Sequence, residues 1–171
     1  VEEQISAQPP KGLGAQKGIK KGFFGLEGEE KQPLRRVSNN LEFDRVTGGG
    51  LVSGSATLVG GDPGIGKSTL LMQIAAALST KTTCAYISGE ESIDQLRLRA
   101  ARLNLTKAPV KLAAVTSVRD IAATLGDRNG PKVVIIDSIQ CMYMDSIESA
   151  PGTVSQVRTS AQELIRLAKY S

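Results

Sequence analysis

The stretch GGDPGIGKSTLLMQ (60–73) has residue types at a spacing that can hold a nucleotide phosphate. Gly61 is followed, after four residues, by Gly66, Lys67 and Ser68, which is the P-loop (Walker A) pattern. Glycines let the backbone turn tightly and aim its N–H groups at phosphate oxygens, and the helix that begins at Gly66 adds its positive end. Lys67 neutralises charge on the β- and γ-phosphates, and the Ser68 hydroxyl can bind magnesium. The residues expected to contact the nucleotide are Gly61, Asp62, Pro63, Gly64, Ile65, Gly66, Lys67, Ser68 and Thr69.

The segments on either side of this loop have the periods of a strand and a helix. SATLVGG (55–61) is a short apolar run that begins after glycines, and it predicts a buried strand. GKSTLLMQIAAALS (66–79) predicts a helix, because its apolar residues recur on one helical face. Those residues are Leu70, Leu71, Ile74, Ala75 and Leu78. A strand before the loop and a helix after it favour a phosphate site over an ordinary glycine-rich turn.

A carboxylate stands at the end of another apolar segment. KVVIID (132–137) is apolar on both faces, which predicts a strand in the middle of a parallel sheet, and Asp137 is its last residue. Because parallel strands end on the same edge of a sheet, Asp137 is expected beside Lys67 and Ser68. There it can hold magnesium through a water molecule. The alternative is a carboxylate that only caps the next turn.

The same geometry applies to Glu90, which lies just past the predicted strand TCAYIS (83–88). A carboxylate at that edge can orient a water molecule for attack on the γ-phosphate. Glu90 and Lys67 are therefore the candidate catalytic residues. Glu91 competes with Glu90 for this role. Either glutamate can instead serve only as negative charge at the start of the following helix.

The remaining segments continue the alternation of strands and helices. A further strand is predicted at 110–115, and helices are predicted at 91–104, 117–127 and 153–170. Ser92 with Gln95 has the spacing of a capping box, as does Ser117 with Asp120. Together these segments predict an α/β fold with a mostly parallel sheet flanked by helices. Since the chain stops after a helix, where the alternation calls for another strand, we expect this fold to be truncated at its C-terminal end.

Residues 1–36 differ in composition from the rest of the chain. They are rich in glycine and lysine and have no sustained period, which predicts a linker or flexible arm before a domain at 37–171. Four lysines of this arm follow one another without an intervening acid, so it is either a solvated linker or an arm that touches nucleic acid. These lysines are Lys11, Lys17, Lys20 and Lys21. Phe23, Phe24 and Leu26 are apolar enough to dock onto the domain.

Composition narrows the choice of cofactor and compartment. The 171 residues contain no histidine, and Cys84 and Cys141 have no CxxC partner, so this chain alone is not expected to build a zinc site or a disulfide framework. The two cysteines are expected to be small buried apolar residues. No apolar run approaches the roughly 18 residues of a membrane span, and the N-terminus is not that of a signal peptide, so we expect a cytoplasmic protein with no membrane partner. The net charge of +4 is compatible with a polyanionic partner.

The order of the P-loop, Glu90 and Asp137-Ser138 resembles that of the RecA-like ATPases. The motif sequences are most similar to those of the bacterial RadA-like (Sms-type) recombination and repair family. The stretches that resemble it are FDRVTGGGLV, GGDPGIGKSTLLMQ, YISGEES, QLRLRAARL, IIDSIQ and SAPGTVSQVR. As a set, these stretches are far more specific than a P-loop alone.

The resemblance implies a RecA-like P-loop core and an ATP- and Mg²⁺-dependent, DNA-stimulated ATPase of the helicase type. Such a protein acts in DNA repair and homologous recombination by branch migration of recombination intermediates. It implies a hexameric ring in the complete protein, single-stranded or branched DNA as a partner, and a recombinase as a further possible partner. It assigns water activation to Glu90 and DNA approach to the segment around 144–156. The family's four-cysteine zinc finger is absent here, so zinc is expected only in an N-terminal finger of the complete protein, and this stretch alone is expected to be weakly active or inactive.

Residue evidence for DNA contact is thinner than that for nucleotide binding. The loop after Asp137 contains Asp145 and Glu148, which do not attract phosphates. Arg97, Arg99 and Arg102 form a basic helical stretch that is either a solvated face or, through Arg97, a contact to the nucleotide base. Two other functions therefore stay open beside the DNA motor. One is a P-loop small-molecule kinase, and the other is a nucleotide-dependent interaction module without turnover.

Overall fold

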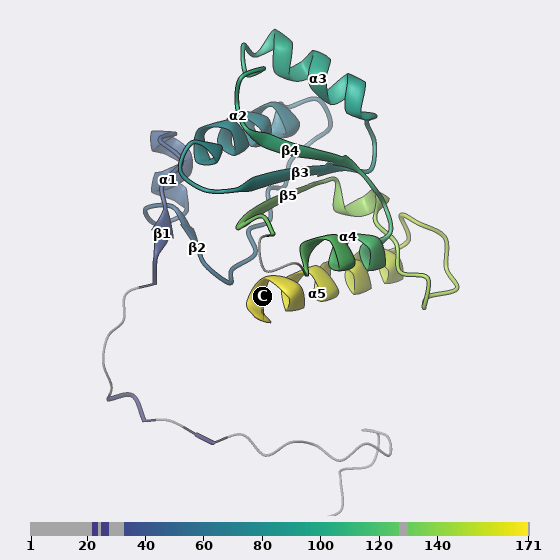
Figure 1. The fold of residues 1–171 in the computed structure, drawn as a ribbon. Helices are drawn as coiled ribbons and strands as arrows, with labels where there is room; N and C mark the ends of the chain where they lie inside the picture. Colours follow the sequence, from purple (N-terminus) through teal and green to yellow (C-terminus); the bar gives the residue numbers. More distant parts are fainter. Residues whose placement is uncertain (1–21, 24, 28–32, 127–129, 171) are drawn as a thin grey trace, which may run out of the picture. The chain divides into compact units, whose positions relative to one another are not determined.

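The computed structural model describes residues 22–23, 25–27, 33–126 and 130–170 (Figure 1). The chain divides into two units, Val1–Gln32 and Pro33–Ser171, and the described residues of the first unit form no helix or strand. The predictions about Phe24 and about the lysines of the arm lie outside the described residues. The second unit begins before the predicted boundary at residue 37, because it includes strand β1 (Arg35–Arg36). It contains all the helices and strands discussed below.

A parallel sheet forms the centre of the second unit. Its strands are β3 (Cys84–Ser88), β4 (Val110–Ala114) and β5 (Val133–Asp137), in the order β4-β3-β5, as the apolar segments predict. In the register of this sheet, Ser88 at the end of β3 lies opposite both Ala114 and Asp137. The carboxyl ends of the strands therefore meet at one edge, which is where the sequence places its candidate carboxylates.

The middle position in this sheet belongs to β3 and not to β5. All five residues of β3 are buried, because it pairs with a strand on each side. Among the described residues β5 pairs only with β3, so the prediction that 132–137 lies in the middle of the sheet is wrong. Apolar residues on both faces of β5 have another cause. They contact helices on the two sides of the sheet, with Ile135 in one buried cluster and Val134 and Ile136 in another.

Helices cover both faces of the sheet (Figure 1). On one face lie α2 (Lys67–Ser79) and α3 (Ile93–Arg102), and on the other lie α4 (Val118–Leu125) and α5 (Val154–Tyr170). These helices agree with the predicted segments. The capping box of Ser92 and Gln95 is present with both of its hydrogen bonds, and the Ser117 side chain accepts from the Asp120 N–H.

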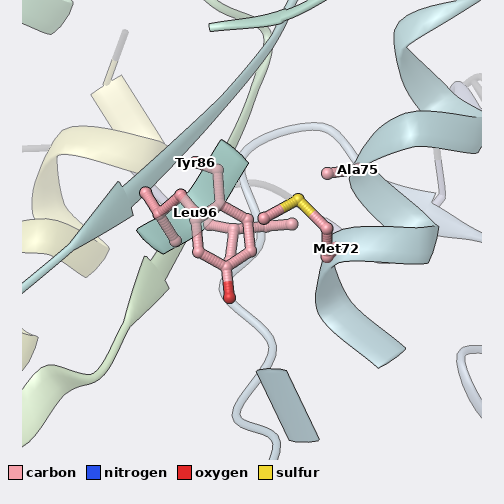
Figure 2. Packing of buried hydrophobic residues seen from close by; sticks show 5 residues of the cluster. Met72, Ala75, Tyr86 and Leu96 are labelled. Atoms are coloured by element: carbon pink, nitrogen blue, oxygen red, sulfur yellow. The ribbon is translucent and has the colours of Figure 1, made fainter. Parts of the chain in front are cut away.

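The buried cluster on the α2 side is built around an aromatic ring. It consists of Met72, Ala75, Tyr86, Leu96 and Ile135, which come from two helices and two strands. Figure 2 shows the Tyr86 ring lying among the apolar side chains, with its hydroxyl pointing out of the cluster. A second cluster, on the α4 side, contains Ile87, Val118, Ile121 and Met142. The alternation of Tyr86 and Ile87 between the two clusters follows from the two-residue period of a strand.

A small subdomain precedes the P-loop and was not predicted from the sequence. It consists of β1, the helix α1 (Leu41–Val46) and β2 (Leu51–Val52), which pairs antiparallel with β1. Asn40 caps α1, and the buried Asp44 carboxylate accepts hydrogen bonds from the Ser38 N–H and hydroxyl. These elements are too short to show a hydrophobic period. A single-turn 3-10 helix, η1 (Ile139–Cys141), follows β5.

The prediction of a buried strand at 55–61 is wrong. The segment forms no strand, and Leu58 in its middle is 84% exposed. A buried strand needs a neighbour that bonds its N–H and C=O groups. Within the described residues the sheet is β4-β3-β5, and it does not include this segment. None of the helices in the described part of the chain is long and apolar enough to cross a membrane.

Replacing Leu96 with alanine tests the core on the α2 side. Leu96 is fully buried against Tyr86, whereas Leu98 on the same helix is 60% exposed. We expect Leu96→Ala to lower the free energy of unfolding by about 2–5 kcal/mol, because it leaves a cavity. Leu98→Ala is the matched control and should change that free energy by less than about 0.5 kcal/mol. Urea unfolding followed by circular dichroism measures both, and equal losses would contradict the packing described here.

Candidate nucleotide-binding site

The P-loop leads directly into α2. Gly64 and Gly66 have positive φ angles of 80° and 102°, which favour glycine, and a Cβ at either position would meet no atom within 4 Å. Gly66 is the residue before the helix, and no side chain caps the first turn. The N–H groups of that turn can therefore serve an external acceptor. Residues 61–66 are exposed, so such an acceptor can reach them from solvent.

The Lys67 ammonium lies inside this loop. Its Nζ donates to the carbonyl oxygens of Gly61 and Asp62, each at 2.7 Å. This places the positive charge within the turn that the glycines make. The conformation fits an anion held between the ammonium and the first turn of α2. The prediction that residues 61–69 contact a nucleotide is compatible with this geometry and stays a prediction.

Tyr86 connects the P-loop helix to the end of β5. Its hydroxyl donates a short hydrogen bond to Asp137 Oδ2 and lies 3.5 Å from the carbonyl oxygen of Ser68. Burial first, and then the Asp137 carboxylate, raise the pKa of the Tyr86 phenol far above its ordinary value, so the hydroxyl stays a donor. The Ser68 backbone carbonyl and the Asp137 carboxylate, which belong to the two predicted magnesium ligands, thus both lie near one phenol hydroxyl.

The site also contains a cation that the sequence interpretation missed. Arg99 of α3 lies with Nη2 at 2.7 Å from Glu91 Oε2 and Nη1 at 3.8 Å from Asp137 Oδ2. Arg97, the candidate for the nucleotide base, instead pairs with Asp94 on the exposed face of α3. The signal for Arg99 was present in the sequence, because it is three residues after Leu96 and therefore on the same helical face.

The two glutamates after β3 have different surroundings. Glu90 Oε1 accepts hydrogen bonds from the Ser138 hydroxyl at 2.6 Å and from the Gln140 amide at 3.3 Å. Glu91 is paired with Arg99. The hydrogen-bond partners of Glu90 are neutral groups, whereas the partner of Glu91 is a cation. The prediction that Glu90 orients a water molecule stays a prediction.

A close approach of two chain segments brings Glu90 and Ser138 together. The Gly89 N–H donates to the Asp137 carbonyl oxygen at 3.0 Å. A Cβ at Gly89 would lie 2.6 Å from Cys141 Cβ, so only glycine allows this approach. Cys141 is a free, partly buried thiol whose pKa is raised, chiefly by burial, and Cys84 is free and buried. Cys84 agrees with the expectation of a buried apolar residue, whereas Cys141 is only partly buried and its Sγ lies 3.5 Å from Glu90 Oε1.

The donor set fits magnesium better than it fits a metal held by the protein alone. In the ranges that the structure describes, no group of three or more Cys, Asp or Glu side chains is arranged to hold a metal ion. Magnesium keeps several waters and commonly binds one or two protein oxygens together with substrate phosphates. One hydroxyl, Ser68, and one carboxylate, Asp137, meet that requirement.

Two further features border the site. A groove of about 510 Å³ lies at the ends of β3 and β4, and Glu90, Glu91 and Asp120 line it together with hydroxyl groups.

The loop after η1, which the sequence interpretation assigned to DNA approach, is held by the buried Gln156 side chain. Its amide makes hydrogen bonds of 2.9–3.1 Å to the backbone of residues 144, 147 and 149. Asp145 in this loop pairs with Arg119 at 2.9 Å.

Comparison with known sequences identifies the family of this chain. Residues 42–169 match the protein family described as AAA domain. The chain is 53% identical over 172 residues to the DNA repair protein RadA of Brucella abortus, covering 98% of this chain and 37% of that protein. It is 49% identical over 136 residues to the DNA repair protein RadA of Bacillus subtilis, covering 78% of this chain and 30% of that protein. The chain thus spans about a third of the length of these relatives.

Comparison with solved structures gives the fold. The crystal structure of the flagellar accessory protein FlaH from Methanocaldococcus jannaschii matches with a TM-score of 0.57 and 18% sequence identity. The match covers 81% of this chain and 68% of that one. At this identity the likeness concerns the fold alone. The chain therefore belongs to the AAA domain family, as a RadA-type domain with the RecA-like α/β fold.

Proposed function

We propose that this domain binds ATP with Mg²⁺ and hydrolyses it as the ATPase part of a cytoplasmic DNA-repair motor. The observation that supports this most is the position of Tyr86, whose hydroxyl lies between the P-loop helix at Ser68 and the carboxylate of Asp137. A nucleotide bound at the P-loop would have its magnesium ion beside both predicted ligands. Residues 61–69 would hold the phosphates, as the sequence predicts.

Each proposed role follows from a contact. The Lys67 ammonium, now on the carbonyls of Gly61 and Asp62, is placed to neutralise the β- and γ-phosphates. Magnesium, when bound, supplies further neutralisation of phosphate charge. Ser68 would hold this ion directly and Asp137 would hold it through water.

Glu90 is the proposed base or water-orienting group. Its carboxylate accepts a hydrogen bond from the Ser138 hydroxyl. Ser138 directly follows Asp137, the proposed magnesium ligand, so this bond keeps Glu90 near that ligand. A carboxylate in that position can accept a hydrogen bond from the attacking water and so direct it at the γ-phosphate. The pairing of Glu91 with Arg99 leaves that glutamate less suited to the same task.

The DNA part of the proposal has a different kind of support. The names of the relatives point to DNA repair, and the Gln156-bonded loop at 144–149 lies just beyond the Asp137 strand. We propose that this loop approaches single-stranded or branched DNA in the complete protein, which would work as a hexameric ring in recombination and branch migration, with a recombinase as a further partner. A zinc finger would belong to a part of the complete protein outside this chain.

Replacing Lys67 with alanine tests nucleotide turnover. We expect Lys67→Ala to lower the ATP hydrolysis rate of the complete protein by about 100-fold or more, because a preorganised charge at the transferring phosphate is lost. Lys81→Ala, which removes an exposed lysine just after α2, is the matched control and should keep the wild-type rate. Phosphate release is measured with and without single-stranded DNA.

The response of the hydrolysis rate to DNA distinguishes a DNA motor from the other candidate functions. Stimulation of the wild-type rate by DNA is expected for the motor. If hydrolysis proceeds without any response to DNA, the motor proposal fails and a different acceptor of the phosphate must be sought. If Lys67→Ala hydrolyses ATP as fast as Lys81→Ala, the P-loop assignment itself fails.

Replacing Glu90 with glutamine tests water activation separately from binding. We expect Glu90→Gln to slow hydrolysis by about 100-fold while the affinity for a non-hydrolysable ATP analogue changes little, because only the proton-accepting group is removed. Glu42→Gln on the exposed face of α1 makes the same chemical change away from the site and serves as the control. Single-turnover hydrolysis and equilibrium binding measure the two effects. A larger loss of hydrolysis in Glu91→Gln than in Glu90→Gln would reverse the assignment.

A further inference from the structure

Tyr86 combines a buried ring with a hydroxyl that reaches the candidate site. The ring is fully buried and packs with Met72, Ala75 and Leu96 (Figure 2). A tyrosine in such a core normally needs a hydrogen-bond partner for its O–H group. Here that partner is the Asp137 carboxylate, and the Ser68 carbonyl lies 3.5 Å from the same hydroxyl oxygen. The side chain therefore touches both segments that are expected to meet at the magnesium ion.

The contacts to Asp137 select one of its two oxygens. The Tyr86 hydroxyl donates to Oδ2, and Arg99 Nη1 lies 3.8 Å from the same atom. Neither group is placed on Oδ1. A hydrogen bond to one oxygen restricts the rotation of a carboxylate about its Cβ–Cγ bond, and so restricts the direction of the other oxygen.

The charge on Arg99 does not replace the hydroxyl in this task. Its guanidinium is closer to Glu91, at 2.7 Å, than to Asp137, at 3.8 Å. Nη1 is buried and has no hydrogen-bond partner among the described residues. Arg99 thus adds positive charge near Asp137 but donates no hydrogen bond to it from Nη1. The directional bond to this carboxylate comes from Tyr86.

From these contacts we propose that Tyr86 is a positioning residue for the magnesium–nucleotide complex, acting through the orientation of Asp137. The inference rests on the proposed function of the P-loop site and adds a group that neither the P-loop nor the strand-end carboxylates include. Residues that hydrogen-bond a metal-ligating carboxylate fix its orientation, and their loss typically costs 10- to 100-fold in metal affinity or activity. In this role Tyr86 touches neither the nucleotide nor the metal.

The competing explanation is that Tyr86 only fills the core. The two roles depend on different parts of the side chain, since packing needs the ring and positioning needs the hydroxyl. Tyr86→Phe keeps the ring against Met72 and Leu96 and removes only the hydroxyl. Tyr143→Phe makes the same change at a partly buried tyrosine outside the α2-side cluster and is the matched control.

The test measures nucleotide binding by the complete protein at controlled magnesium. A fluorescent ATP analogue is titrated first in EDTA and then at rising Mg²⁺ concentration. We expect Tyr86→Phe to bind the analogue in EDTA as wild type does but to need about tenfold more Mg²⁺ for half of the magnesium-dependent gain. Tyr143→Phe should follow the wild-type curve. In an Asp137→Asn background, Tyr86→Phe should have no further effect on the Mg²⁺ requirement, because the two side chains act as one unit.

Several results would overturn the inference. An unchanged Mg²⁺ requirement in Tyr86→Phe, beside a normal magnesium response of the wild type, removes the positioning role and leaves the proposed function standing. An equal loss of affinity in EDTA and in Mg²⁺, or a Tyr86→Phe protein that does not fold, assigns the hydroxyl to structure alone. A wild-type protein whose nucleotide binding ignores Mg²⁺ removes the proposed metal site and this inference together.

Discussion

The hydrogen bond between the Tyr86 hydroxyl and the Asp137 carboxylate is the contact on which the candidate site depends. It begins in the core, where the Tyr86 ring packs against α2 and α3, and it ends at the carboxyl edge of the sheet. A partly buried carboxylate such as that of Asp137 loses part of its hydration, and a hydrogen-bond donor compensates for this loss. The same hydroxyl lies 3.5 Å from the Ser68 carbonyl oxygen, so it contacts both the strand that carries Asp137 and the first turn of α2.

The chain after β3 gives two adjacent glutamates different chemistry. Glycine is the only residue type that position 89 accepts, because a Cβ there would collide with Cys141. The close approach of the two segments places Glu90 against Ser138. Glu91 faces α3 and is neutralised by Arg99. One carboxylate thus meets neutral donors at the edge of the site while its neighbour becomes part of an ion pair. The difference in their surroundings follows from the backbone path and not from the residue types, which are identical.

Sequence periodicity predicted the sheet strands and the helices around them, because buried apolar faces leave a regular signal. It was wrong about 55–61, since an apolar run predicts a strand only if a neighbour is there to bond it, and pairing partners are not visible in a run of letters. The carboxyl-edge rule predicted that Ser68 and Asp137 lie close together, and in the structure the Tyr86 hydroxyl contacts the backbone of one and the carboxylate of the other. It did not reveal the role of Tyr86, because a tyrosine in an apolar strand is read as a core residue. It did not reveal the role of Arg99 either, because the neighbouring arginines made the whole stretch look like a solvated face. The family resemblance already favoured Glu90 over Glu91 for water activation, and the structure adds that Glu91 is paired with Arg99.

A crystal structure of the complete protein with a non-hydrolysable ATP analogue and Mg²⁺ tests the central claim most directly. The account predicts the analogue's phosphates between the Lys67 ammonium and the first turn of α2, with the metal on Ser68 and one water-mediated contact to Asp137. It also predicts Glu90 facing the γ-phosphate and Tyr86 still bonded to Asp137. An analogue bound elsewhere, or one bound at the P-loop with Glu90 and Asp137 both remote from its phosphates and metal, would contradict the account.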